Sequence, residues 1–215
     1  QDRLGLWANK SALSVIPDEW WQANKVTPAP LVGPVVLAVE TTLDRTDTAI
    51  AVVGGREDGG CVATLAASDR NPAKASGLLP AHRAVGRVAE IVRDNEDVTA
   101  VVVDGRASSA SLIDGLRSAL EGLDVELVVM NLGDLAEACA QAYDSIADGS
   151  LNHWDEPRLN ASVRGAVKRD IGDGAWAWSR RKGGSAVAPI MAVTEARWEW
   201  QRRQGLDYDI ADSLG

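Results

Sequence analysis

Apolar residues occur along this chain in short unbroken runs that polar turns separate. Runs of about five apolar residues bounded by turns are typical of buried β-strands. The first run extends from Val35 to Val39, and glycine pairs flank the turn that follows the second run. The pattern predicts five strands, at residues 35–40, 48–54, 61–67, 99–103 and 125–130.

Elsewhere apolar residues recur every three or four positions, which is the spacing of one helix face. The first such segment runs from Val85 to Val92. Ser108 or Ser109, and also Asn131, stand where helix N-caps are expected, because their side chains accept backbone N–H bonds. The spacing predicts helices at 81–93, 108–120, 134–147, 157–168 and 188–203, with a short turn or strand at 175–178.

The order of these elements indicates one fold class. Three consecutive strands joined by short turns form an antiparallel unit, and the later strands alternate with helices as in βαβ crossovers. We therefore predict an α/β fold with a mixed five-stranded sheet and helices on both faces. In this topology the strand at 35–40 lies centrally, beside the strand at 99–103.

Length and composition favour one folded domain with short extra segments. A chain of 215 residues, 46% of them hydrophobic, is long enough for a sizeable core. No apolar stretch is long enough to span a bilayer, and we expect no membrane partner. Cys61 and Cys139 are far apart and lack CxxC spacing, which predicts reduced, buried thiols. We expect a linker or packing arm at 1–30, a domain at 31–204 and a loose tail at 205–215.

Two acidic residues end predicted strands, and a third lies in a glycine-rich turn. Glu40 follows the run at 35–39, Asp104 follows the run at 100–103, and Asp173 stands between two glycines. Neighbouring strands lie about 4.8 Å apart. Carboxylates at the ends of adjacent strands can therefore share a divalent metal, or a metal pair about 3.5–4 Å apart.

Charge is distributed unevenly along the chain. The net charge is −9, which by itself opposes binding to nucleic acid. The segment 158–182, however, has seven basic and two acidic residues, so its net charge is +5 and that of the remainder is −14. This basic segment surrounds Asp173, and it predicts a surface that faces phosphates. A solvated face of mixed charge is the alternative.

One stretch of sequence resembles a known family. The residues RDIGDGAWAWSRR at 169–181 are similar to the nuclease domain of phage terminase large subunits, particularly those of actinobacterial phages. Further similarities lie in LGLW at 4–7, VIP at 15–17 with the tryptophan at 20, DGRA at 104–107 with SLI at 111–113, the segment 134–143, the histidine at 153, PRL at 157–159 and the alanine at 161. The resemblance covers nearly the whole chain.

The resemblance implies a ribonuclease H-like fold and a hydrolase activity. The family cuts concatemeric viral DNA when packaging begins and ends, so the chain is expected to be an endodeoxyribonuclease that uses one or two Mg²⁺ or Mn²⁺ ions. Glu40, Asp104 and Asp173 are the implied catalytic residues and metal ligands. The residues expected to hold the DNA backbone, without reading bases, are Lys168, Arg169, Arg180, Arg181 and Lys182.

The resemblance also implies partners and a location. The expected partners are double-stranded DNA, the terminase ATPase domain, the portal protein and the small terminase subunit. The place of action would be the cytoplasm of the infected bacterial host. The chain begins with Gln1 and has no GxxxxGK[ST] loop for an ATPase, so we expect a fragment or processed product that holds only the nuclease portion.

One departure from the family and two alternatives remain open. The family usually has Asp at the first acidic position, where this chain has Glu40. Glutamate also ligates hard cations, but its extra methylene moves the carboxylate by roughly one bond length, and catalytic geometry is sensitive to shifts of about 1 Å. The first alternative is a non-catalytic docking module of the packaging motor. The second is an actin-like or sugar-kinase-type nucleotide-binding domain, which would need two repeated halves with glycine-rich loops, and no second half is visible.

Overall fold

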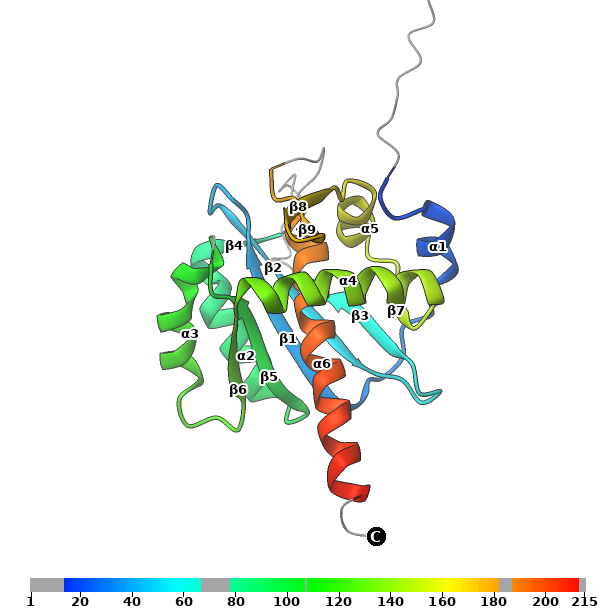
Figure 1. The fold of residues 1–215 in the computed structure, drawn as a ribbon. Helices are drawn as coiled ribbons and strands as arrows, with labels where there is room; N and C mark the ends of the chain where they lie inside the picture. Colours follow the sequence, from blue (N-terminus) through cyan, green and yellow to red (C-terminus); the bar gives the residue numbers. More distant parts are fainter. Residues whose placement is uncertain (1–13, 67–77, 107, 182–186, 213–215) are drawn as a thin grey trace, which may run out of the picture.

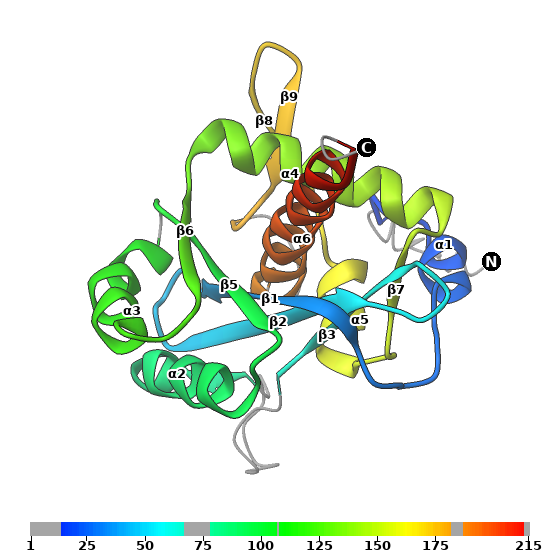
Figure 2. The ribbon, with the colours of Figure 1, turned by 90° about the horizontal axis from the view of Figure 1, so that it is seen from below.

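The computed structural model describes residues 14–66, 78–106, 108–181 and 187–212, with side chains described up to residue 204. A mixed sheet runs through the middle of the molecule, with helices on both of its faces (Figures 1 and 2). The strand order is β6 (Glu126–Met130), β5 (Val98–Asp104), β1 (Val32–Thr41), β2 (Asp47–Gly55), β3 (Cys61–Leu65) and β7 (Leu151–His153), and the short strand β4 (Leu79–Pro80) also pairs with β2. This architecture confirms the predicted α/β fold.

All five predicted strands are present. They are β1 (Val32–Thr41), β2 (Asp47–Gly55), β3 (Cys61–Leu65), β5 (Val98–Asp104) and β6 (Glu126–Met130). The sheet has seven strands rather than five, because β4 (Leu79–Pro80) and β7 (Leu151–His153) extend it. Segments of two and three residues are too short to show a period in the sequence, so the pattern did not reveal them.

The pairing of the central strands confirms the predicted topology. Strand β1 is antiparallel to β2 and parallel to β5. Val39 of β1 is in register with Val103 of β5, so the next residues, Glu40 and Asp104, emerge side by side at the carboxyl edge of the sheet. The register of two buried parallel strands therefore fixes where both acidic side chains begin.

Alternation along the strands divides the core into two layers. Val36 and Ala38 pack in the layer that contains α4 (Leu132–Asp148), α5 (Pro157–Arg164) and α6 (Ala188–Asp212). Leu37 and Val39 pack in the other layer, with α2 (Ala84–Asp94) and α3 (Ile113–Leu120). Successive side chains of a strand point to opposite faces, and burial of both faces explains the nearly continuous apolar runs.

Helix starts follow the sequence in one case and depart from it in another. Asn131 caps α4 through a capping box with Asp134, as predicted for this asparagine. The helix predicted at 108–120 is instead a 3₁₀ turn, η2 (Ser109–Leu112), followed by α3, and Ser108 makes no side-chain cap. A second 3₁₀ turn, η1 (Ala81–Arg83), precedes α2.

The segment after α4 differs most from the prediction. The helix predicted at 157–168 ends at Arg164, and residues 168–172 form β8 (Lys168–Gly172), which pairs with β9 (Ala175–Trp178) in a separate hairpin. The predicted tail is also wrong in part, because α6 continues as a helix to Asp212. From Ala188 to Trp200 every residue of α6 is buried, so packing against the sheet specifies this helix.

The start of the described chain packs onto the domain. In the short helix α1 (Asp18–Ala23), Trp21 is fully buried and stacks on His153 with ring centroids 3.9 Å apart. Its indole Nε1–H donates to Asn160 Oδ1 at 2.7 Å. This part of the predicted arm therefore contributes to the core. Within the described ranges, no helix is long and apolar enough to cross a membrane.

Candidate active site

Glu40 and Asp104 meet at the carboxyl edge of the sheet, as the sequence predicted. Each side chain is only 1% exposed. A buried carboxylate is costly unless it is paired and hydrogen-bonded. The contacts around these two residues therefore decide what the site can do.

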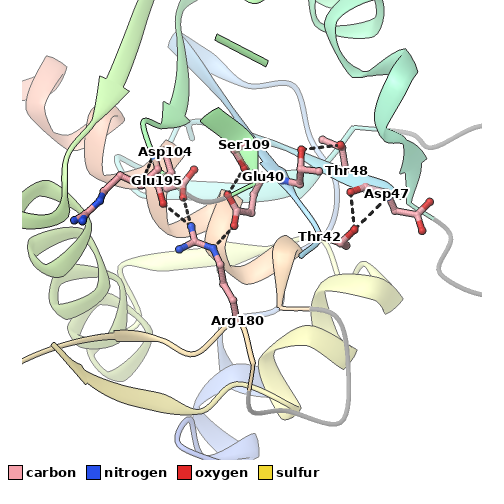
Figure 3. A network of polar contacts seen from close by, with 10 residues as sticks. Glu40, Thr42, Asp47, Thr48, Asp104, Ser109, Arg180 and Glu195 are labelled. Carbon is pink, nitrogen blue, oxygen red and sulfur yellow. Dashed lines mark hydrogen bonds and ion pairs between the residues drawn. The ribbon is translucent and has the colours of Figure 1, made fainter. Parts of the chain in front are cut away.

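Arg180 bridges the two carboxylates. Its Nε donates to Glu40 Oε1 at 2.5 Å, and its Nη2 donates to Asp104 Oδ2 at 2.7 Å. Figure 3 shows the guanidinium between the two acids. Arg180 lies just after β9 and its side chain is 10% exposed. The planar fork of arginine suits this double contact.

Neutral groups fix the remaining oxygens of the two acids. The Ser109 hydroxyl donates to Glu40 Oε2 at 2.6 Å and accepts the Thr41 backbone N–H at 2.9 Å (Figure 3). Asp104 Oδ1 accepts the Arg106 backbone N–H at 3.0 Å. Ser109, considered in the sequence as a helix cap, is therefore a residue that positions Glu40.

Glu195 is a third acid at this place, and sequence reasoning missed it. It lies on α6, its side chain is fully buried, and its Oε1 is 3.9 Å from Arg180 Nη2. Neither of its carboxylate oxygens has a hydrogen-bond partner. The signal that could have found it is a single glutamate among apolar residues in AVTEA at 192–196, within a helix predicted by its apolar spacing.

Three carboxylates therefore surround one guanidinium. Burial, which disfavours the charged form, raises the pKa of Glu40, although Arg180 and Ser109 oppose the shift. The pKa of Glu195 is raised well above its usual range, first by burial and then by repulsion from Glu40. Burial tends to lower the pKa of Arg180, but attraction to Glu40 and to the other acids outweighs it and raises that pKa. With all three acids ionised, the site would carry more negative charge than Arg180 alone balances.

The donor set suits a hard divalent cation, but its present arrangement does not form a metal cluster. Carboxylate oxygens are the ligands that Mg²⁺ prefers. The oxygens of Glu195 accept no hydrogen bond, and Arg180 Nη2 approaches Glu195 Oε1 only to 3.9 Å. Among the described residues, however, no group of three or more His, Cys, Asp and Glu side chains is placed to hold a metal ion. Arg180 occupies the position between Glu40 and Asp104. The residues fit a metal only once this guanidinium has moved.

The structure does not bring Asp173 to the other predicted ligands. Asp173 is exposed, with a φ of 51°, in the turn between β8 and β9. Figure 2 shows this hairpin projecting from the body of the molecule. Arg180 follows the base of the hairpin, where Lys168 pairs with Trp178, and β9 alone spans about 10–13 Å between base and tip. The left-handed backbone of this turn explains why Asp173 stands between two glycines.

The predicted DNA-binding residues have different surroundings. The Lys168 ammonium lies 3.7 Å and 4.0 Å from the ring centroids of Tyr143 and Trp176. Arg169 is half-buried on β8, and Arg181 is exposed. Lys182 lies outside the described residues. Arg180 faces the carboxylates rather than solvent, so of these side chains only Arg181 is freely presented in the described part of the chain.

A small cavity of about 80 Å³ lies beside Glu40 and Arg180. Thr42, Leu43 and Val187 also line it. A larger cavity of about 290 Å³, beside Arg56 and Trp154, does not include any of the three acids. The carboxylates therefore border the smaller of these two cavities.

Comparison with solved structures shows that the predicted ribonuclease H-like fold is shared with phage large terminases and their nuclease domains. The HK97 bacteriophage large terminase superposes with a TM-score of 0.69 at 18% identity, over 86% of this chain and 43% of that chain. The nuclease domain of the large terminase subunit gp2 of bacterial virus Sf6 gives 0.57 at 13% identity, over 85% and 97%. The large terminase nuclease from thermophilic phage G20c, with bound magnesium, gives 0.50 at 13% identity, over 86% and 96%.

These likenesses confirm the resemblance at the level of the fold. The chain spans less than half the length of the HK97 protein and matches nearly the whole length of the isolated nuclease domains. Similar structures include a variant of the Sf6 domain with manganese and the G20c nuclease with bound cobalt. No protein-family model matches the sequence. A comparison of the sequence with curated proteins found no significant match.

Proposed function

We propose that this chain is the metal-dependent endonuclease domain of a phage DNA-packaging terminase. The observation that supports it most is the meeting of Glu40 and Asp104, on adjacent strands, with Glu195 from α6 in a fold shared with terminase nucleases. Three acids from three elements converge at one buried point.

Glu40, Asp104 and Glu195 would hold one or two Mg²⁺ or Mn²⁺ ions, with Glu195 in the role expected for Asp173 from the sequence. Such ions lower the pKa of a bound water and stabilise the leaving oxygen of a phosphodiester. Ser109 would orient Glu40 and the Arg106 backbone N–H would orient Asp104, through the hydrogen bonds that they already make. These contacts keep the carboxylates in fixed positions.

The substrate would be double-stranded DNA, held through its phosphates. Arg181 is exposed next to the site, and Arg169 and Lys182 belong to the same basic segment. Contacts of this kind position a duplex but do not read its sequence. As the sequence resemblance implies, the ATPase domain, the portal protein and the small subunit would be the partners, in the cytoplasm of the infected host.

One observation favours the second candidate, a non-catalytic docking module. Arg180 already satisfies one oxygen of Glu40 and one of Asp104, so these two acids have a structural partner without a metal. The actin-like alternative needs two halves, whereas the described residues form one ribonuclease H-like unit. The choice therefore lies between a nuclease and a docking module with the same fold.

Cleavage of a supercoiled plasmid in Mn²⁺, Mg²⁺ or EDTA separates these two candidates. Asp104→Asn and Asp173→Asn form a matched pair, because each removes one negative charge without changing side-chain size. We expect cleavage with metal and none in EDTA, a loss of at least about 100-fold in Asp104→Asn, and wild-type cleavage in Asp173→Asn.

Two results would contradict parts of this proposal. Absence of cleavage by folded protein with either metal would favour the docking module, and Glu40→Asp would then test whether the longer acid is responsible. Loss of cleavage in Asp173→Asn would instead return the hairpin tip to the site.

A further inference from the structure

Arg180 occupies the oxygens that a bridging metal would need. Its Nε contacts Glu40 Oε1 and its Nη2 contacts Asp104 Oδ2. The other oxygen of each acid is already committed, to Ser109 and to the Arg106 backbone N–H. A divalent cation between the two strands and the guanidinium therefore compete for the same two atoms.

The charge balance favours a divalent metal in this competition. Three buried carboxylates face one guanidinium, and the oxygens of Glu195 have no hydrogen-bond partner. A divalent ion would neutralise more of this charge than Arg180 does, and it could also bind the oxygens of Glu195, which accept no hydrogen bond. Displaced Arg180 would then need another anionic partner, because burial of an unpaired guanidinium is costly.

A phosphate of DNA offers that partner. Arginine binds phosphate and carboxylate with the same two-pronged geometry. Arg180 is adjacent to the exposed Arg181, and its side chain borders the cavity beside Leu43. A backbone phosphate that reaches this cavity could pair with Arg180 as soon as the metal takes the carboxylates.

We propose that Arg180 is an internal counter-cation which exchanges its carboxylate partners for a DNA phosphate, so that metal and DNA bind cooperatively. This inference rests on the proposed nuclease function and deepens it. By linkage, DNA raises the affinity for the metal by the same factor by which the metal raises the affinity for DNA. Arg180 thus sets the affinity for metal in the absence of DNA.

Isothermal titration with Mn²⁺ in the absence of DNA tests the competition. Arg180→Gln removes the guanidinium that competes, and we expect it to bind Mn²⁺ about 10-fold tighter than wild type or more, within the usual range of coupling between sites. Arg181→Gln is the matched control, because it removes the neighbouring exposed charge without touching the carboxylates, and its Mn²⁺ affinity should equal that of wild type.

Titration with Ca²⁺ in the presence and absence of a short DNA duplex, checked afterwards for intact strands, tests the cooperativity. In wild type the duplex should tighten Ca²⁺ binding by roughly 5-fold or more. In Arg180→Gln this enhancement should disappear. In Arg181→Gln the duplex should bind more weakly, but the enhancement should persist.

The inference is overturned if Arg180→Gln binds Mn²⁺ no tighter than wild type, or if it retains the enhancement by DNA. If Arg180→Gln does not fold, Arg180→Lys can replace it, because lysine keeps the positive charge but lacks the planar fork. Arg180→Lys should bind Mn²⁺ more tightly than wild type, and an equal affinity would count against competition between Arg180 and the metal.

Plasmid cleavage is a separate readout. If the wild-type protein cleaves plasmid but Arg180→Gln and Arg180→Lys bind Mn²⁺ no tighter than wild type, only the counter-cation role of Arg180 is rejected. If these variants bind Mn²⁺ more tightly but the wild-type protein does not cleave, only the nuclease function is rejected.

Discussion

Two regions of this molecule carry the acids that the sequence singled out, and they are built in opposite ways. Glu40 and Asp104 end buried parallel strands, are 1% exposed, and have hydrogen bonds to both carboxylate oxygens. Asp173 is exposed in a turn between two glycines. A strand-end acid is placed by the register of the whole sheet, whereas a turn acid is placed only by local backbone geometry.

The hairpin contributes to the site through its base rather than its tip. Trp178 is fully buried, and its Nε1–H donates to Thr194 Oγ1 of α6 at 3.0 Å. Trp176 packs edge-on against Trp178, with ring centroids 4.7 Å apart. Two residues beyond Trp178 the chain delivers Arg180 to the carboxylates. The conspicuous tryptophan motif therefore anchors the arginine and leaves Asp173 in solvent.

The largest expected effect on stability comes from removing the buried side chain of Trp178. Trp178→Ala should lower the free energy of unfolding by about 3–5 kcal/mol, because it removes a fully buried indole and leaves a cavity. Trp176→Ala, at a half-buried position, should cost clearly less. Urea denaturation followed by circular dichroism measures both. If both substitutions lowered the free energy of unfolding equally, Trp178 would not be the main anchor of the hairpin.

Added metal should stabilise the protein through the buried carboxylates and not through the tip of the hairpin. At a Mn²⁺ concentration of 100 times its dissociation constant, binding to the folded state raises the free energy of unfolding by about 2.7 kcal/mol. We expect this rise in wild type and in Asp173→Asn, and its reversal by EDTA. Asp104→Asn should show little of it. Thermal unfolding with and without EDTA gives the comparison, and a rise that is also lost in Asp173→Asn would place the hairpin tip among the ligands.

The difference between the regions also explains what the sequence could predict. The positions of Glu40 and Asp104 were predictable, because apolar runs in the sequence indicate buried strands and because neighbouring parallel strands end at the same edge of the sheet. Glu195 was not, because an acid within a helix looks like a solvated position until the burial of that helix is known. Asp173 was predicted as a ligand because the motif around it is distinctive, and the structure gives that motif a second explanation in the anchoring tryptophans and the left-handed turn.

Arg180 shows a second limit of prediction from sequence. Its place in a basic segment predicted contact with DNA, but the segment's net charge says nothing about which side chain turns inward. The β8–β9 hairpin directs Arg180 to the carboxylates. The sequence does not predict this hairpin, because its pattern assigns the start of β8 to a helix at 157–168. Strands β4 and β7 were missed for a simpler reason, since pairing rather than periodicity defines such short segments.

Glu195→Leu sharpens the contrast at the buried site. Glu195 is buried without a hydrogen bond to either carboxylate oxygen, so an apolar side chain of similar size should raise the free energy of unfolding in EDTA by at least about 1 kcal/mol. The same variant should lose the stabilisation by Mn²⁺. Glu137→Gln, which removes an exposed acidic charge on α4, should stay within about 0.5 kcal/mol of wild type. A destabilised Glu195→Leu would mean that Glu195 serves mainly as a structural partner of Arg180.

The smallest effects are expected at the hairpin tip, where backbone conformation alone should matter. Asp173 has a φ of 51°, which glycine adopts freely and β-branched residues adopt at a cost of roughly 1–2 kcal/mol. Asp173→Gly should therefore leave stability within about 0.5 kcal/mol of wild type, whereas Asp173→Val should destabilise by about 1 kcal/mol. Both should cleave plasmid as wild type does, because neither touches the carboxylates. If Asp173→Gly kept its stability but lost cleavage, the carboxyl group itself would be needed, and the tip would have to fold back onto the site during the reaction.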